Sequence, residues 1–124
     1  MACAATDSKQ KLPGAPSGWR AAGPGEQTIR LLFAQPQAVH RIWLEFVEPG
    51  VERTQEFVLR WSPDGGQSVH EVVRQQWNFS PHGATGQTED LRVDLPGVTV
   101  LELSIVPDIG GGTAHASLTR LRLA

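Results

Sequence analysis

The feature that most constrains the fold is an alternation of apolar and polar residues with a period of two, which begins at Gln27. Successive side chains of a β-strand point to opposite faces, so this pattern is typical of strands with one buried face. No segment shows a convincing helical period of 3.6 residues. The sequence therefore predicts an all-β chain with strands over 29–34, 42–46, 57–61, 69–77, 91–95, 101–105 and 120–123.

Several short antiparallel strands bury their apolar faces only when a second sheet covers them. We therefore expect an antiparallel β-sandwich of jelly-roll type. Parallel strands, which are buried on both faces, would give unbroken apolar runs instead of this alternation. Val72 and Val73 interrupt the alternation, which predicts a bulge there. The side chains expected to face the core are Ile29, Leu31, Ile42, Leu44, Phe46, Phe57, Leu59, Leu101, Leu103 and Ile105.

The first part of the chain lacks this alternation. Residues 1–18 contain prolines and glycines without a sustained hydrophobic period, so we expect an irregular N-terminal tail. Trp19 is a large aromatic that should anchor this segment to the core, and residues 19–124 are expected to form a single β-sandwich domain. The start shows no secretory-signal pattern and no apolar run is long enough to span a bilayer. We therefore expect a cytoplasmic protein with no membrane association.

Charge and residue types exclude several functional classes. A net charge of −2 argues against a nucleic-acid-binding surface, which usually needs clustered basic residues. Cys3 is the only cysteine, so neither an intramolecular disulfide nor a cysteine zinc site can form. The four histidines are scattered along the chain. We predict no transition-metal site and no cofactor, whereas calcium bound through loop carbonyls remains open.

The usual catalytic signatures are absent from the sequence. There is no Gly-x-Ser-x-Gly elbow and no His-Glu-x-x-His, and the glycine run at 110–112 is not followed by a lysine. We therefore predict no catalytic residues and a protein that is not an enzyme. A hydrolase built on a pair of carboxylates is kept as a minor alternative.

The strongest candidate for a binding site is the end of the strand over 69–77. Trp77, Asn78, Phe79 and His82 combine aromatic rings with an amide before a glycine-containing loop. Aromatic faces stack on the C–H patches of sugars, while amides and Arg bind hydroxyl groups. The loop at 49–54 follows a strand two crossings earlier, so Arg53 should lie at the same end, opposite the turn at 64–66. In the competing interpretation, Trp77 and Phe79 plug the end of the sandwich.

A second aromatic indicates a different class of function. Trp43 alternates with Ile42 and Leu44, so its ring should point away from the core. An outward Trp on a flat apolar face is typical of a protein interface, although a neighbouring loop can also cover such a ring. The leading hypothesis is a non-catalytic module that binds a glycan or another small polar ligand. The alternative is a protein-interaction or assembly domain of the same fold.

Three segments together resemble the discoidin, or coagulation-factor type C, family. They are Gln27–Leu31, Val39–Leu44 and Phe57–Gly66, the last of which resembles a family strand that ends in Ser-x-Asp-Gly. Trp19 and the closing segment Ser117–Leu123 are also similar. The resemblance implies a galactose-binding-like jelly roll that binds glycans, and sometimes lipids or proteins, without catalysis. The Asp-Gly opening near which the family often binds calcium is missing here.

Overall fold

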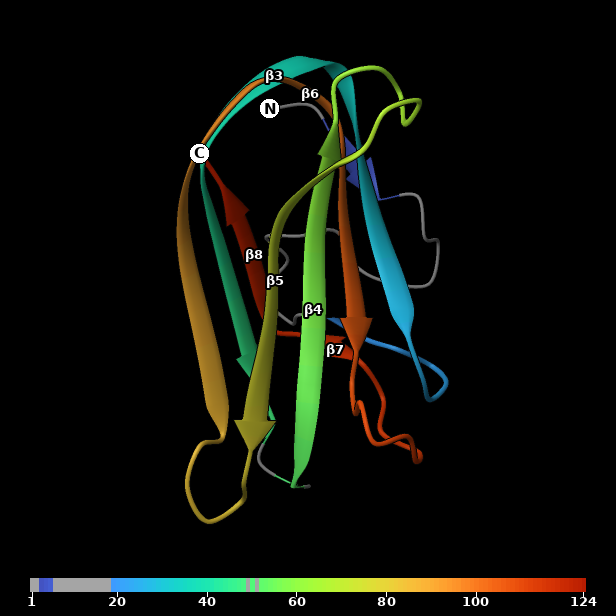
Figure 1. Ribbon diagram of the computed structural model, residues 1–124, viewed down its shortest axis with the longest axis vertical. Helices are drawn as coiled ribbons and strands as arrows, with labels where there is room; N and C mark the ends of the chain where they lie inside the picture. The colour runs from blue at the N-terminus through green and yellow to red at the C-terminus, as the bar shows by residue number, and fades with distance from the viewer. Residues whose placement is uncertain (1–2, 6–18, 49, 51) are drawn as a thin grey trace.

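The computed structural model describes residues 3–5, 19–48, 50 and 52–124, and within them the chain forms strands, turns and loops without a helix. The named strands of this described part pair antiparallel throughout (Figure 1), which confirms the prediction of an antiparallel all-β chain. No helix capable of crossing a bilayer occurs among these residues. The strands are β1 (Cys3–Ala5), β2 (Trp19–Arg20), β3 (Gln27–Val47), β4 (Arg53–Ser62), β5 (His70–Phe79), β6 (Gly86–Val106), β7 (Ser117–Leu118) and β8 (Arg120–Leu123).

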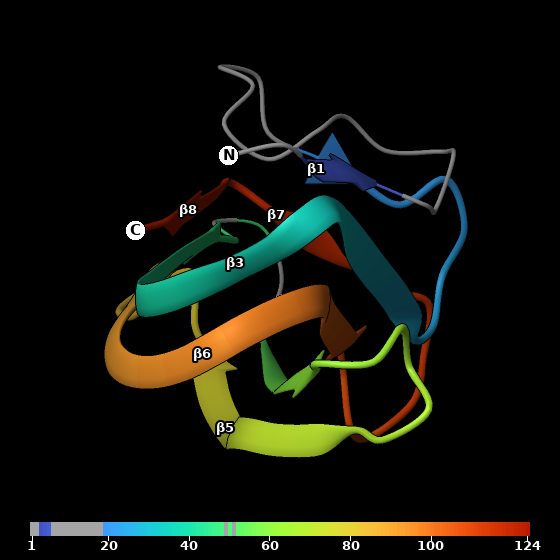
Figure 2. The same ribbon diagram turned by 90° about the horizontal axis from the view of Figure 1, so that it is seen from above.

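Two long strands determine the architecture. β3 and β6 contain 21 residues each, pair along their length and bend together over one end of the molecule (Figures 1 and 2). Their halves near residues 27 and 106 join β1, β4 and β5 in one layer, in the order β1-β3-β6-β4-β5. Their other halves and β8 form the facing layer. This is the expected β-sandwich, with a small additional sheet of β2 and β7.

The sequence predicted four separate strands where β3 and β6 run on without a break. Residues 33–36 of β3, including Pro36, lie opposite Thr99 alone, and Pro96 and Gly97 of β6 lie opposite Ala38. Proline removes a donor from the ladder, but a bulge leaves the extra residues unpaired and bends the strand. The prolines therefore bend these strands instead of ending them.

The core confirms which face of each strand is buried. All ten side chains assigned to the inner face are at most 2% exposed. The rings of Phe46 and Phe57 come from opposite layers, and their centroids lie 5.4 Å apart. Trp19 packs into the same core, as expected of an anchor. The predicted bulge is also present, because Leu59 pairs with Val73 and Arg60 with Glu71, which leaves Val72 unpaired.

The N-terminal segment differs in part from the irregular tail expected over 1–18. Cys3–Ala5 pair with Leu31–Phe33 at the edge of β3 and form β1. Backbone groups at a sheet edge can pair with any extended segment, so a strand there needs no alternating pattern. Residues 1–2 and 6–18 of the expected tail lie outside the described residues.

The turn between β4 and β5 is held by Asp64. Its carboxylate accepts hydrogen bonds from the Ser68 backbone N–H at 2.8 Å, the Ser68 hydroxyl at 2.7 Å and the Ser62 hydroxyl at 2.8 Å. Gly65 and Gly66 complete the turn with φ angles of 74° and 102°, which favour glycine. The hydrogen bonds from Ser68 and Ser62 lower the pKa of Asp64 from 3.8 to about 2.

This shift predicts how the turn responds to acid. The folded-state pKa of Asp64 lies below its unfolded value, so the ionised group stabilises the fold above pH 3.8 and loses that effect as the pH falls through about 2. Asp64→Asn should lower the melting temperature at pH 5, and the difference from the unsubstituted protein should shrink towards pH 2. Thermal unfolding followed by circular dichroism across this range measures it. A difference that stays constant with pH would contradict the assignment.

Candidate functional site

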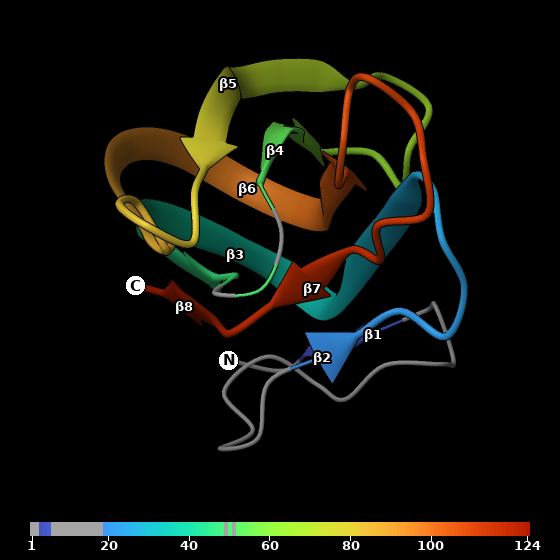
Figure 3. The same cartoon turned by 90° about the horizontal axis from the view of Figure 1, so that it is seen from below.

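Three loops and one short segment meet at one end of the sandwich. They are the β3–β4 loop, the β5–β6 loop, the β6–β7 loop and residues 21–26, all at the lower end of Figure 1 and in front in Figure 3. Arg53 and Phe79, which begin β4 and end β5, are paired at this end. The turn at Asp64 lies at the opposite end, beside the bends of β3 and β6. The β3–β4 and β5–β6 loops therefore lie at one end and the Asp64 turn at the other, as the sequence predicted, whereas the β6–β7 loop and residues 21–26 were not predicted to join them.

Arg53 joins the loops of this end from inside. Its side chain is only 1% exposed. One Nη donates to the backbone carbonyl of Pro107, and the other donates to Glu48 Oε2 at 2.9 Å. The guanidinium also lies 5.2 Å from the centre of the Phe79 ring. Arg53 thus has a structural role: it connects the β3–β4 loop, the end of β5 and the β6–β7 loop.

Glu48 is held ionised by this arrangement. Burial disfavours the charged carboxylate, but the hydrogen bonds from Arg53 and from the Gly50 backbone N–H outweigh it, and the charges of Arg53 and Arg20 add to them. The pKa of Glu48 is therefore lowered below its ordinary value. Glu48 and Arg53 are therefore both charged and form an ion pair that joins the loops of this end.

The larger cavity at this end has a volume of about 600 Å³. Its lining includes an amide, a carboxylate, a hydroxyl and an exposed aliphatic side chain, from Asn78, Asp108, Thr54 and Ile109. The Thr54 hydroxyl donates to Asn78 Oδ1 at 2.6 Å, and this contact does not use the NH₂ group of the Asn78 amide. Ile109 is 49% exposed. The cavity therefore offers hydrogen-bond donors and acceptors beside a small apolar surface.

The wall that contains Asp108 is shaped by local hydrogen bonds. Asp108 Oδ1 accepts from the Gly110 backbone N–H at 3.0 Å, and the Asp108 carbonyl accepts from the Gly111 N–H at 3.0 Å. The backbone N–H of Ile109 donates to the Thr54 carbonyl at 2.9 Å, which ties the loop to β4. Gly111 and Gly112 have φ angles of 91° and 90°, which allow the reversal. Asp108 thus projects from a loop that is anchored at its base.

A smaller cavity of about 180 Å³ lies beside the first, and Arg53 and Asp108 line both. Its other lining residues include Arg20, Glu48 and His115. The His115 Nδ1 lies 3.1 Å from the Ala21 carbonyl, which fixes the ring against the segment before β3. Among the described residues, no three His, Cys, Asp or Glu side chains come together to hold a metal ion. The chemistry visible at this end is hydrogen bonding and charge pairing.

The structure brings together only some of the predicted site residues. Arg53, Asn78 and Phe79 line the larger cavity, but Phe79 is 1% exposed and fills the end of the core. For Phe79 the competing interpretation, a plug, is therefore the one observed. Trp77 is 37% exposed on the edge strand β5 and does not line either cavity of this end. His82 is exposed in the β5–β6 loop and also lies outside both.

Sequence reasoning missed Asp108, Ile109, Glu48 and His115 as contributors to this end. The signal for Asp108 was available, because the β6–β7 loop follows a strand that ends on the same side as β3 and β5. The same crossing argument that placed Arg53 would have placed this loop too. No sequence signal marked the pairing of Glu48 with Arg53, which depends on how three loops converge.

The face around Trp43 differs from the flat apolar patch that a protein interface would favour. The ring points outward, as predicted, but the guanidinium groups of Arg41 and Arg122 lie 5.7 and 5.9 Å from it. Arg41 is in turn held by two hydrogen bonds to Asp90, at 2.8 and 2.7 Å. The ring is thus flanked by cations on a polar surface.

Comparison with solved structures identifies the fold. No protein-family model and no curated protein matches the sequence. CpGH89CBM32-5 from Clostridium perfringens, solved with GalNAc-β-1,3-galactose, is similar at a TM-score of 0.64 and 16% identity, over 98% of this chain and 94% of that one. The family 32 carbohydrate-binding module of C. perfringens NanJ, solved with galactose, is similar at a TM-score of 0.63 and 12% identity, over 98% and 92%.

A third structure extends the comparison. The family 32 module of AlyQ, solved with 4,5-unsaturated mannuronic acid, has a TM-score of 0.63 and 17% identity, over 98% of this chain and 93% of that one. The chain therefore has the galactose-binding-like β-sandwich fold, which confirms that part of the resemblance read from the sequence. At these identities the likeness establishes the fold alone, and function depends on the site.

Proposed function

We propose that this chain is a non-catalytic carbohydrate-binding module that holds its ligand in the larger cavity at the loop end. The observation that carries the proposal is the lining of that cavity by Asp108, Asn78 and Thr54 beside the exposed Ile109. A carboxylate, an amide and a hydroxyl suit the hydroxyl groups of a sugar, and an aliphatic side chain suits its C–H face. The discoidin-type family is the proposed relative within this fold.

The solved neighbours support the same proposal. Three similar structures were determined with sugars bound, namely GalNAc-β-1,3-galactose, galactose and 4,5-unsaturated mannuronic acid. They share the fold and not the sequence, so the identity of the sugar has to come from this chain. Trp77 remains a proposed contributor through its exposed ring at the edge of β5, next to Asn78.

Asp108→Ala is expected to weaken sugar binding by at least about tenfold, because a carboxylate that accepts from sugar hydroxyls contributes about 1.5–3 kcal/mol. A glycan array with the purified protein identifies a ligand, and isothermal titration calorimetry then compares the variants. Asn78→Ala should weaken binding in the same direction.

Asp94→Ala is the matched control. Asp94 is 91% exposed and pairs with His40 near the bend of β3, at the end away from the cavity. This variant should bind as the unsubstituted protein does. Equal affinity in all three variants would exclude the larger cavity as the sugar site, and Trp77→Ala would then test the edge of β5.

A further inference from the structure

A separate cavity of about 390 Å³ lies on the outer face of the layer that contains β4 and β5, beside the β4–β5 turn. It is at the opposite end of β4 from the loop cavities. Small-molecule sites commonly have volumes of about 300–1,000 Å³, with apolar walls and a few polar groups. The volume of this cavity falls in that range, and nothing in the proposed sugar site uses it.

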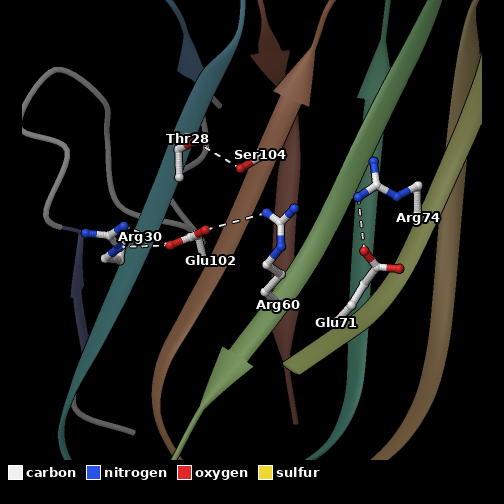
Figure 4. Close-up of polar contacts among 7 residues, drawn as sticks. All are labelled: Thr28, Arg30, Arg60, Glu71, Arg74, Glu102 and Ser104. Carbon is white, nitrogen blue, oxygen red and sulfur yellow. Dashed lines mark hydrogen bonds and ion pairs between the residues drawn. The ribbon is translucent and has the colours of Figure 1, made fainter. Parts of the chain in front are cut away.

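The polar side of the cavity is a row of three charged side chains across three strands. Arg30 of β3, Glu102 of β6 and Arg60 of β4 lie side by side, as Figure 4 shows. Arg30 donates to Glu102 Oε2 through Nε at 3.1 Å and Nη2 at 2.8 Å. That oxygen is therefore occupied by Arg30. The other oxygen, Oε1, forms an ion pair with Arg60 Nη1 at 3.6 Å, a separation longer than that of a hydrogen bond.

Arg60 is the unusual member of this row. Its side chain is 30% exposed, and the described part of the chain gives its guanidinium no hydrogen-bond acceptor. A guanidinium has five N–H donors in a planar fork that matches a carboxylate in two-point geometry. By contrast, Arg74 on the same face donates to Glu56 at 3.0 Å and to Glu71 at 3.1 Å. Arg60 thus brings to the cavity a guanidinium that is paired with Glu102 by charge and makes no hydrogen bond to the described residues.

The remaining wall of the cavity is apolar and unusually exposed. Leu32 and Val69 are 41% and 49% exposed, and both line this cavity together with Val100. Large aliphatic side chains gathered at one concave surface favour contact with an apolar part of a ligand. Gly65 and Gly66 form the rim, in the turn that Asp64 holds through Ser62 and Ser68. The rim is therefore preorganised by contacts within the protein.

We infer that this cavity is a second binding site, for a small organic carboxylate that has an apolar face. The carboxylate accepts hydrogen bonds from the Arg60 guanidinium, and the apolar face lies against Leu32, Val69 and Val100. The site is independent of the sugar cavity, since the two share no lining residue. The carboxylate can belong to a sugar acid or to an aromatic or aliphatic acid, because the chemistry presented by the cavity is the same.

The test is a titration of the ¹⁵N-labelled full chain followed by NMR. Sodium benzoate provides both the charge and the apolar body, benzamide removes the charge and sodium acetate removes the apolar body. Benzoate should shift the amide signals of Gly65, Gly66 and Val69 saturably, and benzamide and acetate should bind at least about tenfold more weakly. Sodium glucuronate distinguishes the two sources: binding tighter than benzoate supports a sugar acid, and weaker binding supports an apolar acid.

Two variants and one control locate the site. Arg60→Gln removes the cation and should weaken benzoate binding at least about tenfold. Val69→Asp adds a negative charge at the rim, outside the core, and should have the same effect. Arg74→Gln removes a cation of the same face that already has two acceptors and should leave binding unchanged. Melting temperatures measured on all three show that each variant folds.

Benzoate binding that survives both Arg60→Gln and Val69→Asp, or equal binding of benzoate and benzamide, would overturn the inference. The absence of saturable shifts around the β4–β5 turn would do so as well. The result is distinct from that for the proposed function, because Asp108→Ala should not change benzoate binding. Conversely, Arg60→Gln should not change sugar binding at the loop end.

Discussion

Replacing Leu44 with alanine is expected to lower the free energy of unfolding by about 2–5 kcal/mol. Leu44 is fully buried in the layer that contains β8. It pairs with Glu89 of β6 on one side and with Leu121 of β8 on the other. Truncation removes apolar contacts from a packed core and leaves a cavity that the fixed backbone of two neighbouring strands cannot fill. Urea denaturation of the variant and the unsubstituted protein, fitted with a common slope, gives the difference directly.

Leu32 provides the matched control on the same strand. It faces outward and is 41% exposed, so Leu32→Ala should change the free energy of unfolding by no more than about 0.5 kcal/mol. The comparison holds residue type and strand constant, while the face of the strand and the burial of the side chain differ. Similar costs for the two substitutions would show that the two faces of β3 have been assigned wrongly.

The second large effect is expected at the loop end. Arg53→Met should destabilise the protein by about 3 kcal/mol, because breaking a buried ion pair leaves the remaining charge without its partner. Here the remaining group is Glu48, whose side chain is 12% exposed. The substitution also removes the hydrogen bond to the Pro107 carbonyl. Thermal and urea unfolding measure the loss, and the glycan-binding assay reports whether the loops keep their shape.

A double variant separates charge from packing. Adding Glu48→Gln to Arg53→Met neutralises the stranded carboxylate and should restore part of the lost stability. Arg74→Met is the control for removing a cation from an exposed ion pair, and it should lower the stability much less than Arg53→Met does. If Arg53→Met lowers the free energy of unfolding no more than Arg74→Met does, Arg53 does not stabilise the loop end in this way.

The sequence predicted the core well because side-chain alternation is a local property. Whether Leu44 or Trp43 points inward follows from strand geometry alone, and both were placed correctly. The continuity of β3 through Pro36 was not predictable in the same way. Whether a proline ends a strand or sits in a bulge depends on the partner strand, and here that partner comes from residues far along the chain.

The candidate site was predicted less completely, for a related reason. Strand crossings placed Arg53 and Asn78 at one end, because that depends only on counting strands. The depth of each side chain there depends on how separate loops pack. Arg53 was expected to face a ligand, but its guanidinium is buried between Glu48, Pro107 and Phe79. Counting strands also places the loop of Asp108 at this end, but that Asp108 lines both cavities depends on how the glycine-containing loop folds back, which no hydrophobic pattern marks.

The passage of β3 and β6 through both layers also constrains how the chain can fold. Their pairing joins Gln27 to Ile105 at one extreme and Val47 to Gly86 at the other. In the sequence, the whole β4–β5 hairpin lies between these two strands. Closing such a loop costs entropy before any of these contacts forms, so folding should be slow compared with folds built on local contacts. The β4–β5 hairpin can form early, because its turn is short and is held by Asp64. Because each layer contains one half of β3 and one half of β6, the pairing of these two strands couples the formation of one layer to that of the other.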